Sequence, residues 1–91
     1  MKKVGIIGGG AMGSGIAQVA ATAGHDVVVF DTKAEALNLS KSKLAKVMTR
    51  LVEKEKLTFE VALTIQGRIS YTDNLESIAE SGIIIEAIVE N

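Results

Sequence analysis

The 91-residue sequence has no cysteine and no proline, one histidine and three aromatic residues. Without cysteine there can be no disulfide, no thiolate nucleophile and no cysteine-ligated zinc. A metal site built from several histidines is excluded because His25 is the only one. Phe30, Phe59 and Tyr71 are too few to form a platform on which single-stranded nucleic acid could stack.

The chain also lacks an excess of charge of either sign, with a net charge of −1. A basic footprint for nucleic acid or for an anionic membrane is therefore absent, and we expect neither partner. The hydrophobic fraction of 47% is typical of a folded domain and argues against disorder. The length allows one small domain, or part of a larger one.

An uncharged stretch over residues 4–24 raises the alternative of a membrane segment. It follows Lys2 and Lys3, and residues 21–23 resemble a signal-peptidase site. The stretch contains seven glycines and several polar residues, so it is a poor helix former and only weakly hydrophobic. We therefore expect a soluble, cytoplasmic protein.

Apolar runs and amphipathic stretches alternate along the sequence. The predicted strands are Val4–Ile7, Val27–Phe30, Arg68–Tyr71 and Gly82–Val89, and helices are predicted over 11–23, 33–56, 58–66 and 74–79. Continuous apolar strands are typical of buried parallel strands. With right-handed crossovers, this series predicts an α/β fold: a Rossmann-type doubly wound parallel sheet with helices on both faces. It is incomplete, with about four strands, and has an extended helical segment between the second and third.

The helices carry apolar faces and candidate caps. The first is predicted to bury a stripe of Ile16, Val19, Ala20 and Ala23, with Gly13 and Ala17 small enough to permit close packing on a sheet. The long one is predicted to bury a stripe of Leu37, Leu44, Met48, Leu51 and Val52. Asp31 or Thr32 is the candidate cap of the long helix, Thr58 of the next, and Asp73 or Asn74 of the last.

A glycine-rich motif joins the first strand to the first helix. Gly8, Gly10 and Gly13 form G-x-G-x-x-G, the fingerprint of dinucleotide-binding proteins when it lies between a strand and a helix. Gly8 would permit the tight turn, Gly10 the close approach of a pyrophosphate, and Gly13 the packing of helix on sheet. The first-turn amides of Ala11 and Met12 would then face the phosphates.

An acidic residue stands where this fold needs one. Asp31 directly follows the second strand, eighteen residues after Gly13, in the position that accepts the ribose hydroxyls. A carboxylate favours NAD because it repels the 2′-phosphate of NADP, and Lys33 is a poor substitute for the arginine that NADP would need. A plain helix cap is the alternative role of Asp31.

Other glycine motifs were compared with the same residues. A P-loop requires lysine where Ser14 follows Gly13. The GxxxGxG of short-chain dehydrogenases fits, but Tyr71 lacks its lysine partner four residues later. FAD enzymes share the fingerprint but usually have glutamate at the second strand. A tight turn without a ligand stays open as well.

The segments "GIIGGGAMGSGIAQVAATAGHDVVVFD" and "IIIEAIVEN" resemble the amino-terminal domain of 3-hydroxyacyl-CoA dehydrogenases, including the 3-hydroxybutyryl-CoA enzymes. The resemblance implies oxidation of a (3S)-3-hydroxyacyl-CoA to the 3-oxoacyl-CoA with NAD as acceptor. It places Ala87 and Ile88 in the cofactor groove and Glu90 near the nicotinamide-side ribose. It also implies that the helical arm meets coenzyme A, with Lys54 as candidate and surface solubility as that lysine's alternative role.

The resemblance also predicts what residues 1–91 do not contain. The catalytic His–Glu pair and the serine and asparagine that hold the substrate are expected beyond Asn91, in a separate carboxy-terminal domain for substrate and dimerisation. His25 precedes the second strand, at the wrong edge of the sheet, so we assign no catalytic residue and expect cofactor binding without turnover. Glu86 could face the cofactor crevice or a buried partner.

Two further expectations concern assembly and function. An open last strand with Ile83, Ile84 and Ile85 would offer an apolar edge, so we expect a fragment of a longer chain, a homo-oligomer, or self-association through that edge. Alternative functions are the cofactor domain of a 3-hydroxyisobutyrate or 6-phosphogluconate type of dehydrogenase, and a non-catalytic NAD(H)-sensing module.

Overall fold

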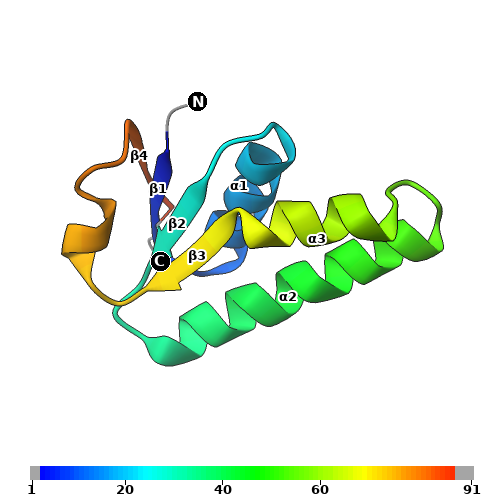
Figure 1. Cartoon of the computed structure of the whole chain (residues 1–91). Helices are drawn as coiled ribbons and strands as arrows, with labels where there is room; N and C mark the ends of the chain where they lie inside the picture. The colour runs from blue at the N-terminus through cyan, green and yellow to red at the C-terminus, as the bar shows by residue number, and fades with distance from the viewer. Residues whose placement is uncertain (1–2, 88–91) are drawn as a thin grey trace.

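The structure is a computed structural model that describes residues 3–87 (Figure 1). Its elements are, in chain order, β1 (Val4–Ile7), α1 (Ala11–Thr22), β2 (Val27–Phe30), α2 (Ala34–Glu53), α3 (Phe59–Gly67), β3 (Ile69–Thr72), the 3₁₀ helix η1 (Leu75–Ile78) and β4 (Ile83–Glu86). Each predicted strand and helix has a counterpart here. The predicted end of the last strand lies outside the described residues.

The four strands form one parallel sheet in the order β3-β2-β1-β4. The chain winds from β1 outward to β3 and then crosses over to the other side of β1. In register, Ile7 lies opposite both Phe30 and Glu86, and Phe30 lies opposite Thr72. All carboxyl ends therefore meet at one edge of the sheet. This topology confirms the predicted doubly wound α/β class.

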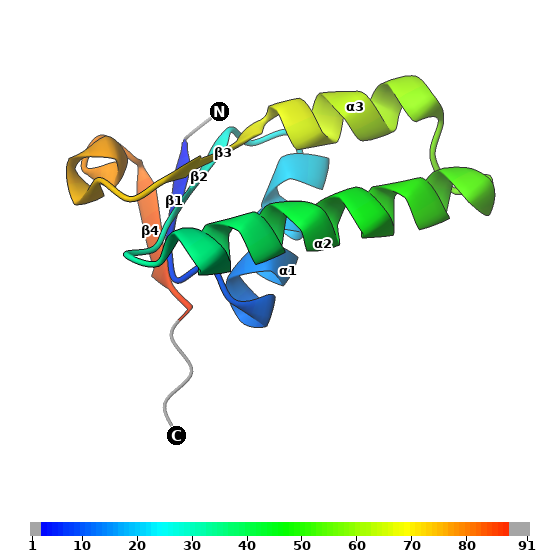
Figure 2. The ribbon, with the colours of Figure 1, turned by 90° about the horizontal axis from the view of Figure 1, so that it is seen from below.

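The two faces of the sheet are covered unequally, as Figure 2 shows. Helices α1, α2 and α3 lie on one side, and η1 lies on the other. A Cβ built on Gly5 would lie 3.2 Å from the Cβ of Ile78 in η1, so this glycine lets η1 pack directly on β1. Within residues 3–87, η1 is the only helix on this second face, where the sequence predicted helical cover.

The main core lies between the sheet and the three α-helices. Its most buried members are Ile6, Val27, Val29, Ala21, Met48 and Ile65. The predicted stripe of α2 is confirmed, since Leu44 and Met48 are buried and Leu37, Leu51 and Val52 pack against the core.

The predicted stripe of α1 is partly wrong. Ala17 is buried against the sheet, as its small size predicted, and so is Ala21, whereas Val19 is 71% exposed and Ala23 is also exposed. Small side chains allow a helix axis to approach a sheet closely, so the residues with the smallest side chains, and not the largest, occupy the contact. Ile16 and Ala20 pack at its margin.

Helices α2 and α3 run antiparallel and project beyond the sheet as an arm (Figures 1 and 2). The Thr58 hydroxyl caps α3 by accepting a hydrogen bond from the Val61 amide, and Asn74 caps η1 in the same way through the Glu76 amide. Both caps were predicted. The cap of α2 was not predicted correctly, because its N-cap residue is Lys33, whose side chain makes no capping hydrogen bond.

The prediction that the last strand is buried is wrong for β4. It is an edge strand, and Ile83 and Ile84 are 43% and 49% exposed. The apolar open edge that we expected is therefore present in the described part of the chain. No helix among residues 3–87 has the length and apolar character needed to cross a bilayer.

Candidate functional site

The turn that leaves β1 has a conformation suited to glycine. Gly8 has φ 112°, in the region that residues with a side chain rarely adopt. Its amide donates to the carbonyl of Phe30 at 2.8 Å, which ties the turn to the end of β2. The sharp reversal brings the chain from the strand into α1 within three residues, as the motif predicted.

Gly13 is required for the close packing of α1 on this turn. A Cβ at Gly13 would collide with the carbonyl oxygen of Gly8 and lie 3.5 Å from Cγ2 of Ile6. The helix can therefore rest against the first strand only without a side chain here. This is the packing role that the fingerprint gives to its third glycine.

Gly10 lies on the open side of the turn. It is the N-cap residue of α1, and a Cβ built on it would meet no atom within 4 Å. Gly10 has no side chain that could cap the amino end of α1, so the first-turn amides keep hydrogen-bonding capacity for a ligand. This end also carries the positive pole of the helix dipole. Space, free donors and positive potential coincide at one place.

Asp31 closes the site from the end of β2. Its Oδ2 accepts a hydrogen bond from the Gly9 amide at 2.9 Å, and its Oδ1 accepts one from the Lys33 amide at 2.9 Å. The sequence predicted Asp31 at this edge but not its contact with the glycine turn. Asp31 is not the N-cap residue of α2, but it accepts a hydrogen bond from the amide of the N-cap residue, Lys33. It therefore fulfils part of the capping role expected of Asp31 or Thr32.

These contacts also set the charge of Asp31. The hydrogen bond from the Gly9 amide, followed by that from Lys33, lowers the pKa of the Asp31 carboxyl below its usual value, against an opposing effect of burial. The group is therefore ionised at neutral pH. A carboxylate has about four lone-pair sites. The two amides occupy one site on each oxygen, and the remaining sites can accept the two hydroxyls of a ribose.

The other predicted site residues are placed as follows. Ala87 is buried at the end of β4, and its amide donates to the Ile7 carbonyl at 2.8 Å, beside the glycine turn. Met12 is 53% exposed in the first turn of α1. Ala11 begins that helix. Ile88 and Glu90 lie outside the described residues.

Lys54 and His25 lie away from this centre, whereas Glu86 lies opposite Ile7 in register, at the end of the sheet where the glycine turn begins. Lys54 is at the far end of α2, a helix of 20 residues and thus about 30 Å long, so it does not join the residues around Asp31. Glu86 is exposed on the edge strand, which contradicts a role with a buried partner. His25 precedes β2, at the amino ends of the strands, as predicted.

A groove that the sequence did not predict adjoins the turn. It has a volume of about 340 Å³ and extends from Gly9 and Gly10 along α2. Lys43 and Lys46 line it together with the buried Ser40. Only the packing of α2 beside the turn brings these lysines near the glycines, so no local sequence signal could have identified them.

Comparison with known proteins agrees with this geometry. Residues 3–91 match the family described as "3-hydroxyacyl-CoA dehydrogenase, NAD binding domain". The chain is 49% identical over 89 residues to a probable 3-hydroxybutyryl-CoA dehydrogenase of Deinococcus radiodurans, covering 98% of this chain and 32% of that protein. It is 37% identical to a fatty acid oxidation complex subunit alpha of a Psychrobacter species, covering 94% and 12%.

Among solved structures, (S)-3-hydroxybutyryl-CoA dehydrogenase from Ralstonia eutropha superposes with a TM-score of 0.94 at 36% identity. The superposition covers 100% of this chain and 32% of that one. The chain therefore spans about a third of the length of its first curated relatives. The family uses NAD, in agreement with the cofactor predicted from Asp31. By its sequence and its fold, the chain belongs to the NAD-binding domain family of the 3-hydroxyacyl-CoA dehydrogenases.

Proposed function

We propose that the glycine turn and Asp31 form the binding site for NAD. The backbone of Gly8, Gly10 and Gly13 and the amides of Ala11 and Met12 receive the pyrophosphate, and the Asp31 carboxylate accepts the hydroxyls of the adenine-side ribose. Ala87 and Ile88 line the groove beside the cofactor. Glu90 stands near the nicotinamide-side ribose.

The observation that carries this proposal is the contact between Gly9 and Asp31. A 2.9 Å hydrogen bond holds the carboxylate against the turn, beside the open space next to Gly10. A pyrophosphate at Gly10 and a ribose at Asp31 are adjacent parts of one nucleotide. The spacing of the two groups therefore fits a single ligand that spans both.

We further propose that the whole protein oxidises a (3S)-3-hydroxyacyl-CoA to the 3-oxoacyl-CoA. NAD, when bound, supplies the hydride acceptor. Residues 1–91 hold and orient that cofactor, and a carboxy-terminal domain supplies the catalytic base and substrate pocket. A missing general base lowers the rate by about 10²–10⁴. The 91-residue chain should therefore bind NADH without oxidising it in the presence of acetoacetyl-CoA, and measurable oxidation would contradict this assignment.

For the acyl-CoA, we propose the basic side of the arm. Lys43 and Lys46 line the groove that begins at the glycine turn, and Lys54 lies further along the same helix. Ammonium groups along this path suit the phosphates of coenzyme A. Lys54→Ala in the full-length protein should raise KM for the acyl-CoA and leave the affinity for NADH unchanged.

The cofactor site is tested by titrating NADH fluorescence in the chain and in Asp31→Ala, with NADPH alongside. Loss of charge-assisted hydrogen bonds to ribose should weaken NADH binding by about ten- to a hundred-fold. NADPH should bind weakly to the unmodified chain. In Asp31→Ala, the affinities for NADH and NADPH should differ less than they do in the unmodified chain. Equal affinity for both nucleotides in both proteins would contradict the proposal that Asp31 binds the adenine-side ribose.

We propose that residues 1–91 are one domain of a longer, cytoplasmic protein. The 3-hydroxybutyryl-CoA dehydrogenases that it resembles are about three times as long, and the exposed Ile83 and Ile84 on β4 offer an edge for a further strand. For the isolated domain, we propose self-association through this edge. Light scattering should show a mass that rises with concentration, and a monomer at every concentration would rule out self-association.

A further inference from the structure

The other edge of the sheet, β3, has a backbone that is free to pair. The amides of Val27 and Asp31 donate to the carbonyls of Arg68 and Thr72, at 2.8 and 3.2 Å. Peptide groups alternate in direction along a strand. The polar backbone groups of Ile69 and Tyr71 therefore point away from β2, toward the open edge. Their side chains face the helices, with Ile69 buried and Tyr71 half-buried.

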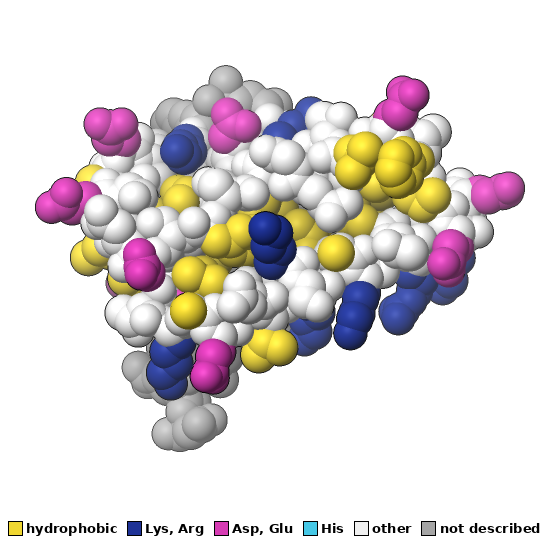
Figure 3. All heavy atoms as spheres, turned by 60° about the horizontal axis from the view of Figure 1, so that its bottom comes forward, with side chains coloured by type: hydrophobic (Ala, Val, Ile, Leu, Met, Phe, Trp, Pro, Cys, Tyr) yellow, Lys and Arg dark blue, Asp and Glu magenta, His cyan; other side chains and the backbone are white. Residues whose placement is uncertain are grey.

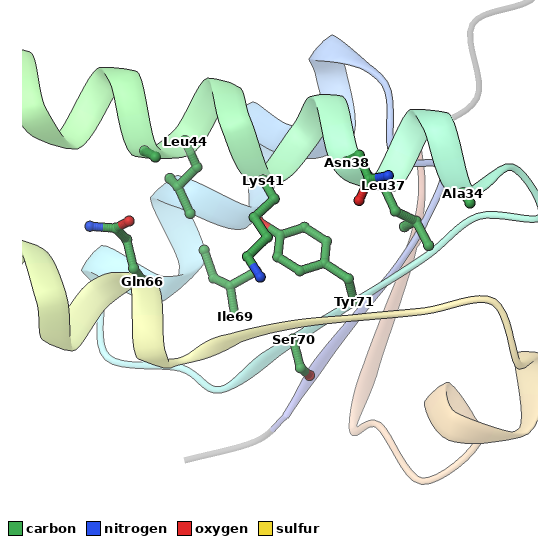
Figure 4. A pocket seen from close by; sticks show the side chains of 10 residues that line it. Ala34, Leu37, Asn38, Lys41, Leu44, Gln66, Ile69, Ser70 and Tyr71 are labelled. Carbon is green, nitrogen blue, oxygen red and sulfur yellow. The ribbon is translucent and has the colours of Figure 1, made fainter.

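A groove of about 520 Å³ runs along this edge between β3 and α2. Figure 4 shows the Leu37 and Leu44 side chains of α2 facing β3, with Ile69 and Tyr71 on the opposite wall. Asn38 and Gln66 add amide groups at its rim. The groove thus offers apolar contact for a side chain next to unpaired backbone groups.

The electrostatic character of the groove is simple. Among the described residues that line it, Lys41 is the one charged residue and none is acidic. In Figure 4 the Lys41 side chain extends from α2 across the groove toward β3. Figure 3 shows, on the face turned to the viewer, a strip of hydrophobic side chains with one basic side chain lying over it. A ligand with apolar groups and one negative charge fits this surface.

We propose that β3 and α2 form a docking site for an extended peptide segment of another protein. The segment adds a strand beside β3 through backbone hydrogen bonds with Ile69 and Tyr71. Alternate side chains of the segment point into the groove, since side chains along a strand alternate in direction. An apolar side chain packs on Leu37, Leu44 and Ile69, and an acidic one two residues away meets Lys41.

The described strand β4 (Ile83–Glu86) of a second copy does not supply that combination. The side chains of Ile83 and Ile85 face α1, so Ile84 and Glu86 point to the opposite face of the sheet. A β4 strand that continued the sheet with helices on the same side would bring no acid to Lys41. The partner is therefore a peptide that carries apolar and acidic residues at every second position, and the cofactor site is not involved.

The test uses ¹⁵N-labelled chain and end-blocked hexapeptides of the form Thr-X-Thr-Z-Thr-X, where X is Val or Leu and Z is Glu or Lys. Peptides with Glu should bind, and they should slow hydrogen exchange of the Ile69 and Tyr71 amides at least about tenfold. Peptides with Lys should bind at least about tenfold more weakly. Methylating alternate peptide nitrogens should abolish binding for one of the two sets only, the set that faces β3.

Two variants distinguish an effect of the charge in the groove from an effect of the overall surface charge on peptide binding. Lys41→Glu should reverse the preference between Glu and Lys peptides, whereas Lys56→Glu, the same change in the turn after α2, should leave it as it was. Both should bind NADH like the unmodified chain. The proposal is overturned if no Glu peptide protects Ile69 and Tyr71, if β4 is protected instead, or if the two variants behave alike.

Discussion

The amide of Gly9 and Oδ2 of Asp31 are 2.9 Å apart, although 22 residues separate them in the sequence. This hydrogen bond joins the turn after β1 to the end of β2. The carboxylate therefore has two tasks in the proposed site, since it holds the glycine turn in shape and presents its remaining lone pairs to the ribose. Changes at Asp31 should alter stability as well as cofactor affinity.

The lowered pKa of Asp31 predicts acid sensitivity. The ionised carboxylate stabilises the folded state above its unfolded pKa of about 3.9, and this contribution is lost as the pH falls through the lower folded pKa. In urea unfolding at successively lower pH, starting from about pH 5, the free energy of unfolding should fall less for Asp31→Asn than for the unmodified chain. Asp73→Asn, in an exposed turn, is the matched control, and an equal effect there would contradict the assignment.

Gly13 and Gly15 offer a paired test within α1. Gly13→Ala would force a Cβ onto the Gly8 carbonyl and should destabilise the fold by about 1–3 kcal/mol, or more if the turn cannot move. A Cβ at Gly15 meets no atom within 4 Å, so Gly15→Ala should stabilise the helix by up to about 1 kcal/mol. Urea denaturation measures the free energy of unfolding of both variants. If this free energy changed in the same direction in both, the close contact between Gly13 and Gly8 would not determine the effect of a side chain at position 13.

Gly10→Ala should lower the affinity for NADH while changing the free energy of unfolding little. Its Cβ meets no protein atom, so the free energy of unfolding should change by less than about 1 kcal/mol. The same methyl would occupy the space proposed for the pyrophosphate, and NADH affinity should fall at least about tenfold, a loss of roughly 1.4 kcal/mol. Fluorescence titration and thermal unfolding of the same sample provide both quantities. Unchanged affinity would place the phosphates elsewhere.

Glu55 carries backbone strain in the turn between α2 and α3. Its φ of 58° lies in the left-handed region, which costs a residue with a side chain roughly 1–2 kcal/mol. Glu55→Gly should relieve most of this cost and raise the free energy of unfolding by about 0.5–1 kcal/mol, since glycine also loses more entropy on folding. Glu53→Gly, within the last turn of α2, should lower it by about 1 kcal/mol instead. Chemical denaturation distinguishes the two directions.

Local pattern was sufficient for much of the fold. The strands Val4–Ile7 and Val27–Phe30, the caps at Thr58 and Asn74, and the positions of Gly8 and Gly13 all follow from side-chain chemistry within a few residues. Such features depend on backbone preferences and nearby hydrogen bonds, which the sequence contains in full. The order of strand, glycine turn, helix, strand and acid was enough to predict a nucleotide site and its cofactor.

Tertiary packing decided the contacts that join residues far apart in the chain. It determined that Ala21 of α1 is buried while Val19 is exposed, and that the Gly9 amide meets Asp31. It also brought α2 beside the glycine turn and β3, which created the grooves containing Lys43 and Lys41. Periodicity shows which side chains share a face, but the closeness of two elements depends on their side-chain volumes together, and only the folded chain combines these.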